Sequence, residues 1–220
     1  MRILSICLLL ALGACGPTLS TLQLPENCRA AQSRSQLIAG NWRQQPHIWR
    51  LRQAALLEIG SKKIPLEGFL RLDLRHKEAR LLALNEMGLV LFDLQVTEQG
   101  EVLHRAIPQI REHKAVARGV AQSLRRIFLQ PLPEANDLLQ TQGNSQGLRR
   151  SLSDGQLEFI FDCSGDLRET RQQAKSGEWQ VIYNDYRDYA GARLPEEILF
   201  NDETHRVKLS LWQKEVKQEL

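Results

Sequence analysis

One short motif in the chain has the residue types of a hydrolase nucleophile. The stretch Gly143 to Gly147, GNSQG, matches the pattern G-x-S-x-G, in which the serine sits on a sharp turn between a strand and a helix. The flanking stretches, LLQTQ and LRRSLSDG, are polar and predict neither the entering strand nor the leaving helix. A flexible loop therefore explains the motif better than a nucleophilic Ser145, and we predict no catalytic residue.

The remaining groups that catalyse reactions or bind metals are spread along the chain. No histidine lies at metal-ligand spacing from another histidine or from a cysteine, so we predict no metal site. Asp185 and Asp188 are three residues apart, and on a strand two such carboxylates point to opposite faces. Neither a phosphate-binding glycine loop nor a dinucleotide fingerprint is present. These patterns predict a binding protein without a cofactor, and not an enzyme.

A cysteine follows the apolar run at the N-terminus. Arg2 precedes the mainly apolar residues 3–12, and the run breaks at Gly13 just before Cys15. This is the layout of a secretory signal, and it is far shorter than the ~20 apolar residues that a transmembrane helix needs. The residues LGAC resemble the lipobox of bacterial lipoproteins, in which the cysteine thiolate takes up lipid and becomes the new N-terminus. We expect residues 1–14 to be the signal peptide and Cys15 to be lipidated; the alternative is an ordinary signal with an incidental cysteine.

Lipid on Cys15 would hold the chain on a membrane. Two or three acyl chains anchor much more firmly than one, since each buried methylene contributes about 0.8 kcal/mol. Resemblance to Gram-negative lipoproteins implies the outer membrane as the destination, because Gly16 follows the cysteine and not the aspartate associated with inner-membrane retention. The expected location is therefore the outer membrane, with the lipid-anchored chain facing the periplasm.

Two further cysteines, Cys28 and Cys163, would remain after removal of the signal. In an oxidising compartment an even pair favours a disulfide. A bond between them would close a long loop, which the chain-entropy model values at roughly 4 to 5 kcal/mol. The alternative is two buried free thiols, because sequence does not show proximity.

Length and charge limit the class of protein. Without the signal the chain keeps about 200 residues, which suits one domain with a sizeable core. The formal charge of the whole chain is +3, and its basic residues alternate along the predicted strands without forming one patch. We therefore expect no nucleic-acid partner.

Alternating apolar and polar residues predict strands through most of the chain. The first run, HIWRLRQAALLEI, places Trp49, Leu51 and every second residue after them on one face. Short turn sequences separate the later runs, which is typical of an antiparallel meander. The predicted strands number about ten and fall before and after a central helix.

Two helices interrupt the strand pattern. A short one is predicted near residues 28–39, within a polar stretch 15–46 that is typical of a tether. The second, over 112–129, carries an apolar stripe at helical spacing and ends before two prolines. An amphipathic helix between two groups of strands packs its stripe on a sheet. We therefore expect one α+β, mainly β domain over residues 47–220.

The chain resembles the LolA/LolB-like proteins in four features. These are the lipobox, the long first strand, the meander EGFLRLDLRHKEARLLALNEMGLVLFDLQV and the late stretch LPEEILFNDETHRVKLSLW. The resemblance covers most of the mature chain, and it is closest to a lipoprotein family with that fold that accompanies lipid or aryl polyene export systems. It implies an unclosed antiparallel β half-barrel, with helices lidding a concave apolar face that accepts acyl chains. It also implies an exposed apolar residue on a loop that enters the membrane, for which Met87 and Leu89 are the nearest candidates.

Two functions follow from these observations. In the first, the chain is an outer-membrane-anchored lipoprotein that binds or accepts a lipidated or long-chain apolar molecule during envelope transport or assembly. Its partners would then be the membrane, an acyl-chain or polyene ligand, and envelope transport proteins. The expected cavity lining, which would otherwise form a packed core, is Trp49, Leu51, Leu72, Leu82, Phe92, Phe128, Phe159 and Trp179. In the second, the chain is a structural or assembly lipoprotein that contacts a partner protein and holds no ligand.

Overall fold

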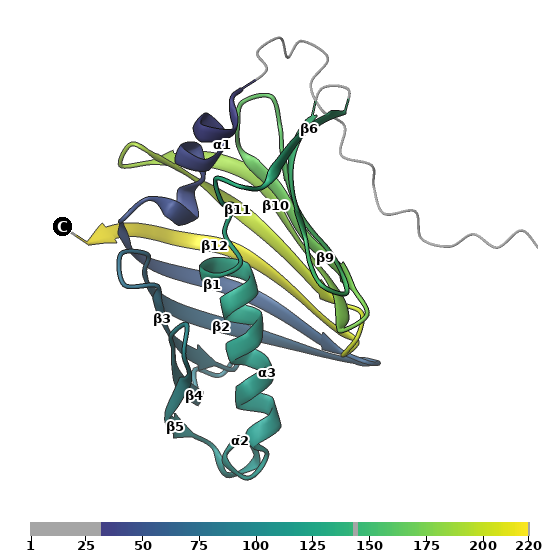
Figure 1. Ribbon diagram of the computed structural model, residues 1–220. Coiled ribbons are helices and arrows are strands. Elements are labelled where there is room, and N and C mark those ends of the chain that lie inside the picture. Colours follow the sequence, from purple (N-terminus) through teal and green to yellow (C-terminus); the bar gives the residue numbers. More distant parts are fainter. Residues whose placement is uncertain (1–31, 143–144, 220) are drawn as a thin grey trace, which may run out of the picture.

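The computed structural model describes residues 32–142 and 145–219, which form a curved sheet and a few helices (Figure 1). The predicted signal peptide, Cys15 and Cys28 lie outside these residues. The strands are β1 (Ile48–Ile59), β2 (Lys62–Asp73), β3 (Glu78–Leu84), β4 (Val90–Val96), β5 (Glu101–Ala106), β6 (Leu138–Gln142), β7 (Ser145–Ser151), β8 (Gly155–Phe161), β9 (Leu167–Ala174), β10 (Gly177–Tyr189), β11 (Ala192–Asp202) and β12 (Val207–Glu219). The helices are α1 (Arg34–Gly40), α2 (Pro108–Glu112) and α3 (Lys114–Leu124), with a 3-10 turn η1 (Trp42–Gln44) and a π-helix η2 (Arg125–Leu129).

All twelve strands in the described part of the chain belong to one antiparallel sheet. Its order is β5-β4-β3-β2-β1-β12-β11-β10-β9-β8-β7-β6. Strands β1 to β5 and β6 to β12 are two meanders, joined where the last strand pairs with the first. Strands β5 and β6 are the two edges, so the sheet stays unclosed. The predicted half-barrel is confirmed, with more strands than the expected ten or so, because β6 comes from the polar stretch LLQTQ.

The β1–β2 hairpin is the longest pair in the first meander. Its ladder runs from Ile48 opposite Asp73 to Ile59 opposite Lys62, so two residues make the turn. Gly60 has a φ of 60°, in the left-handed region that such a tight turn needs and that glycine adopts without strain. Pairing between β2 and β3 ends at Glu67 of β2, which lies opposite Leu84 of β3. The tip of the hairpin therefore projects beyond β3.

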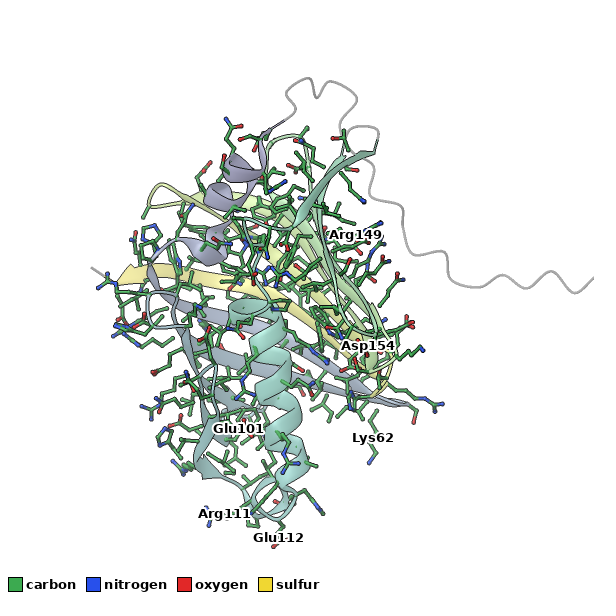
Figure 2. The ribbon with its side chains drawn as sticks, viewed as in Figure 1. Lys62, Glu101, Arg111, Glu112, Arg149 and Asp154 are labelled. Carbon is green, nitrogen blue, oxygen red and sulfur yellow. The ribbon has the colours of Figure 1, made fainter. Side chains whose placement is uncertain are left out.

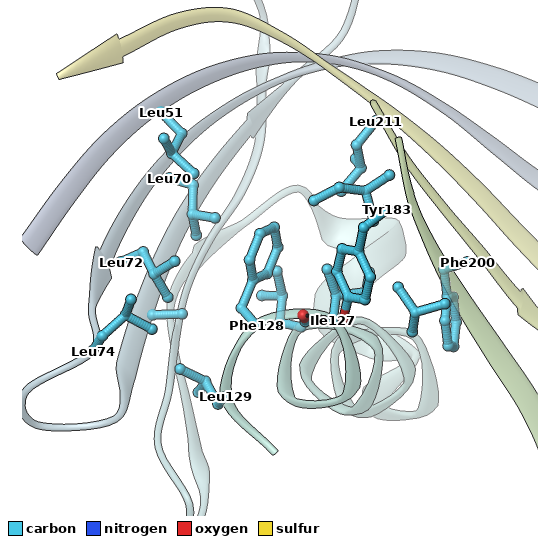
Figure 3. Close-up of a cluster of buried hydrophobic side chains, with 14 of the residues drawn as sticks. Leu51, Leu70, Leu72, Leu74, Ile127, Phe128, Leu129, Tyr183, Phe200 and Leu211 are labelled. Atoms are coloured by element: carbon cyan, nitrogen blue, oxygen red, sulfur yellow. Dashed lines mark hydrogen bonds between the residues drawn. The ribbon is translucent and has the colours of Figure 1, made fainter. Parts of the chain in front are cut away.

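Helix α3 and the π-helix lie across the concave side of the curved sheet (Figure 1). One cluster of buried apolar side chains fills the space between them and the strands. Figure 3 shows Ile127 and Phe128 of the π-helix among Leu51, Leu70 and Tyr183 of the sheet. The core is thus formed by the concave face and its helical cover.

The segment before β1 also belongs to this core. Ser33 caps α1 with a capping box, in which its side chain and that of Gln36 bond each other's backbone N–H groups. Trp42 of η1 is 3% exposed and packs edge-on against Phe128 and Tyr183, with ring centroids 6.3 and 6.2 Å apart. A stretch predicted to be tether and short helix therefore ends in a packed anchor.

The outer face carries cross-strand ion pairs. Glu158 of β8 lies between Arg149 and Arg171 of the neighbouring strands, at 2.5 Å from each, and Arg80 pairs with Asp93 at 2.8 Å. Figure 2 shows charged side chains over the rim, with Lys62 and Asp154 near the strand turns. No helix of the described residues is long and apolar enough to cross a bilayer.

Candidate apolar binding face

The concave face of β1 changes from buried to exposed along its length. Trp49 and Leu51, at the start of the strand, are 1% and 3% exposed. Ala55 and Leu57 are half-buried, and Ile59 at the far end is 45% exposed. Alternation places all of these side chains on one face. Apolar side chains therefore follow this face from the core to the surface, except at Gln53 between Leu51 and Ala55.

Strand β2 repeats this gradient beside β1, and on the other side the half-buried Leu209 and Val207 of β12 lie opposite Leu57 and Ile59. In β2, Leu72 is 0% exposed and Ile64 is 37% exposed. The ladders place Leu57 between Ile64 and Leu209, which makes the exposed ends neighbours. We call the buried end the closed floor: Trp49, Leu51, Leu70 and Leu72. We call the other end the open floor: Leu57, Ile59, Ile64, Leu66, Val207 and Leu209.

Helix α3 and the π-helix cover the closed floor. Ala117, Ala121 and Leu124 are the buried residues of α3, and small alanines let a helix approach a sheet closely. Val116 is 40% exposed, because the covered side of the helix runs through Ala117 and Ala121. Phe128 of the π-helix is 0% exposed. The open floor lies beyond this cover.

Two consecutive arginines fasten the π-helix to opposite halves of the sheet. Arg125 pairs with Glu101 of β5 at 2.8 Å and donates to the Thr97 carbonyl oxygen at 2.7 Å. Arg126 pairs with Asp202 of β11 at 2.5 Å, and its guanidinium lies 5.1 Å from the centre of the Trp179 ring. We call this pair of arginines the clamp. It bridges the concave side where α3 ends.

The electrostatics of the clamp favour the charged carboxylate. Burial by itself raises the pKa of Asp202, but hydrogen bonds from the His205 backbone and side chain, together with Arg126, lower that pKa below its usual value. Burial lowers the pKa of Arg126, and its bond to Asp202 acts in the opposite direction. The pair is therefore ionised at neutral pH. The Tyr183 hydroxyl adds a 2.9 Å bond to the Ile127 carbonyl oxygen.

The structure gathers most of the predicted lining into one core. Leu82 is the exception, because it lies on the outer face opposite Phe69 and Asp93, while Ala79 and Ala83 of the same strand are buried inside. Placing Leu82 in the lining was therefore wrong; the run RLLAL is apolar on both faces, and alternation alone does not choose between them. The seven lining residues found in the core are Trp49, Leu51, Leu72, Phe92, Phe128, Phe159 and Trp179.

The motif at Ser145 has no hydrolase context in the structure. Ser145 opens β7 opposite Gln142 of β6, so the serine lies in an antiparallel strand, and the described residues after it continue in strands and not in a helix. The expected flexible loop is wrong for residues 145–147, which are paired in the sheet. No group of three or more metal-binding side chains occurs among the described residues. Cys163 is disulfide-bonded, and its expected partner, Cys28, lies outside the described range.

Sequence reasoning missed the clamp and the anchoring turn. Arg125 and Arg126 lie off the apolar stripe, and their partners Glu101 and Asp202 are 24 and 76 residues away along the chain. Neither spacing leaves a signal in the sequence. The burial of Trp42 was not predicted, because this residue lies in the polar stretch 15–46.

Two hollows also lie near the surface. One of about 450 Å³ lies between η1, the β2–β3 turn and residues 130–134. The other, of about 660 Å³, lies over the backbones of β12, β1 and β2, beside Trp212 and Pro65 on the outer face. These hollows do not coincide with the closed floor, which its own side chains fill.

The curved, unclosed sheet with a lidded apolar concave face defines the class of LolA-like folds. A LolA superfamily protein from Nitrosomonas europaea has this fold, with a TM-score of 0.54 and 9% identity over 85% of this chain and 94% of that one. The family model described as outer membrane lipoprotein LolB matches residues 59–213. The chain therefore belongs to the LolB family. Family membership places it among the outer-membrane lipoproteins.

Individual relatives match over a shorter stretch. The outer-membrane lipoproteins LolB of Aeromonas hydrophila and Aeromonas salmonicida are 37% and 35% identical to this chain over 57 residues. These alignments span 26% of this chain and 27% of each relative. The resemblance to LolA/LolB-like proteins is thus confirmed at the level of the family.

Proposed function

We propose that the chain accepts a lipidated or long-chain apolar molecule at the outer membrane, to which acyl groups on Cys15 attach it. The observation that supports this proposal is the open floor, which lies on the same strands and the same face as the closed floor. An acyl chain on the open floor would cover Ile59 and Ile64, and burial of apolar surface contributes about 25 cal/mol per Å². Movement of α3 would then extend the apolar track to Leu51 and the other core residues of the expected lining.

The turn between β3 and β4 supplies the membrane contact in this proposal. Met87 is 87% exposed and Leu89 is 53% exposed. The Asn85 side-chain oxygen accepts from both of their backbone N–H groups, at 3.0 and 2.9 Å, which holds the turn in one shape. A fixed apolar tip of this kind fits insertion among acyl chains at a bilayer surface.

The cargo and its source are the finer part of the proposal. We infer a supply of acylated or polyene molecules from envelope transport proteins, as for lipoproteins that accompany lipid or aryl polyene export systems. A polyene would be recognised by its visible absorption, and a lipidated protein by the mass of its acylated cysteine. The apolar floor suits both, because neither needs a charge on the track.

Native mass spectrometry with organic extraction tests the proposal. The chain is purified from its own host with Cys15→Ser and a periplasm-directing signal, so that it leaves the membrane without detergent. A stoichiometric acyl or polyene adduct is the expected result. A reproducible mass of the chain alone would contradict the proposal.

A second candidate function has its own supporting observation. The outer hollow of about 660 Å³ lies beside Trp212, which is 37% exposed, on a face that elsewhere carries ion pairs. An assembly lipoprotein without ligand would use such a surface for a partner protein. In that case, Trp212→Ser would remove partner cross-linking in cells, and a substitution of Ile64 would not.

A further inference from the structure

Two glutamines interrupt the apolar floor where its closed and open ends meet. Gln53 of β1 lies between Leu51 and Ala55 on the concave face and is 3% exposed. Gln213 of β12 is half-buried and is the direct cross-strand neighbour of Gln53. The register of the β1–β12 ladder shifts between Arg52 and Gln53, so the glutamine pair lies directly beside a β-bulge. The two amides therefore lie side by side at one irregular point of the floor.

Each of these amides holds a buried polar atom without a hydrogen-bond partner in the described structure. The atoms are Gln53 Nε2, a donor, and Gln213 Oε1, an acceptor. A Cβ at Gly68 would lie 4.0 Å from Gln53 Oε1, so the carbonyl end of that amide faces β2. Buried polar groups are normally paired, because leaving them unpaired costs stability. An unfilled donor beside an unfilled acceptor is the complement of a second amide group.

We propose that Gln53 and Gln213 bind the amide or ester group at the head of an acyl chain, while the hydrocarbon lies on the open floor. This proposal rests on the proposed function and names the chemical class of its ligand. Gln53 Nε2 would donate to the acyl carbonyl oxygen, and Gln213 Oε1 would accept an amide N–H. From Gln53 to Ile59 the track runs six residues, roughly 20 Å at about 3.3 Å per residue, which accommodates a long extended acyl chain.

The geometry sets an order of affinity for chains of equal length. An amide uses both glutamines, an ester lacks the N–H and uses only Gln53, and a hydrocarbon uses neither. One net hydrogen bond corresponds to about a fivefold to tenfold change in affinity. A variant that is partly unfolded binds both competitors less, so the ratio of the two affinities measured on that variant is unaffected.

The test is competition against a fluorescent naphthylamine probe, using the whole chain with Cys15→Ser. The competitors are N-methyldodecanamide, methyl dodecanoate and tetradecane, whose chains have the same length. The wild-type protein should bind the amide about fivefold to tenfold more tightly than the ester, and the ester about fivefold to tenfold more tightly than tetradecane. Gln53→Leu should abolish the preference for the ester over tetradecane and reduce that for the amide to the value of one hydrogen bond. Gln213→Leu should remove only the preference for the amide over the ester. Gln156→Leu, a glutamine of the outer face of β8, is the matched control and should change nothing.

Equal binding of all three chains by the wild-type protein would overturn this proposal and leave the proposed function standing. Unchanged selectivity in Gln53→Leu would overturn it as well. Failure to bind any of the three chains would count against the proposed function itself. Unfolding in urea gives a second measurement. Gln53→Leu should be at least as stable as the wild type, because the buried Nε2 atom that it removes has no hydrogen-bond partner among the described residues. A clear loss of stability would assign Gln53 a structural role instead.

Discussion

The two ends of the concave floor are built from the same strands and the same apolar residue types, yet they have opposite surroundings. Leu72 and Phe128 are 0% exposed at the closed end, whereas Ile59 and Ile64 are 45% and 37% exposed at the open end. The difference comes from length, because β1 and β2 each have 12 residues and the helical cover reaches only one end of them.

This contrast separates what the fold needs from what a ligand needs. The closed floor is packed by its own side chains and accounts for stability, since burial of apolar surface is the main favourable term in folding. The open floor is only partly covered and yet keeps apolar residues at each inward position from Leu57 to Ile59 and from Ile64 to Leu66. A bound acyl chain would give those residues their missing cover.

The largest expected effect is a loss of stability from the closed end. Phe128→Ala should lower the free energy of unfolding by about 3–5 kcal/mol, because it leaves a cavity among Trp42, Leu70 and Tyr183. Ile64→Ala, at the open end, should change it by less than about 1 kcal/mol. Urea unfolding of both variants measures the contrast, and similar losses would show that the two ends are one packed unit.

The clamp should give the next largest effect. Arg126→Met leaves the Asp202 carboxylate, whose side chain is 6% exposed, without its guanidinium partner, and we expect a loss of about 2–3 kcal/mol. Arg125→Met removes a pair whose side chains are 22% and 28% exposed, and should cost about 1 kcal/mol or less. Hydrogen exchange of the π-helix amides would follow the same order. Equal protection in the two variants would contradict a clamp centred on Arg126.

Much of this architecture could be predicted from the sequence, and the parts that could not have physical reasons. Period-two alternation identified the strand HIWRLRQAALLEI and its inward face, because one covered side leaves a clear pattern. Alternation does not report where the cover ends, so it does not distinguish the exposed Ile59 from the buried Trp49 on the same face. Leu82 was misplaced because its strand is apolar on both faces. The clamp depends on contacts that are distant in sequence, which no local pattern records.

Acid should weaken the clamp before it affects the closed floor. The pKa of Asp202 is lower in the folded chain than its usual value, so its contribution to stability is present above the unfolded-state pKa of about 4 and is lost as pH falls through the folded value. Unfolding curves of wild type and Asp202→Asn should therefore differ at neutral pH and converge below about pH 4. A difference that persisted at lower pH would mean that the carboxylate stabilises the fold in its protonated form.

The smallest effect on stability should accompany a clear effect on binding. Ile64→Ser replaces a 37% exposed side chain, so the free energy of unfolding should fall by less than about 0.5 kcal/mol. The same change removes apolar surface from the open floor, and affinity for N-methyldodecanamide should drop about fivefold to tenfold if the chain covers that residue. Val102→Ser, an exposed apolar residue of the edge strand β5, is the control and should alter neither quantity. Equal affinities in Ile64→Ser and the control would place the acyl chain off the open floor, and would leave that floor as an exposed extension of the core.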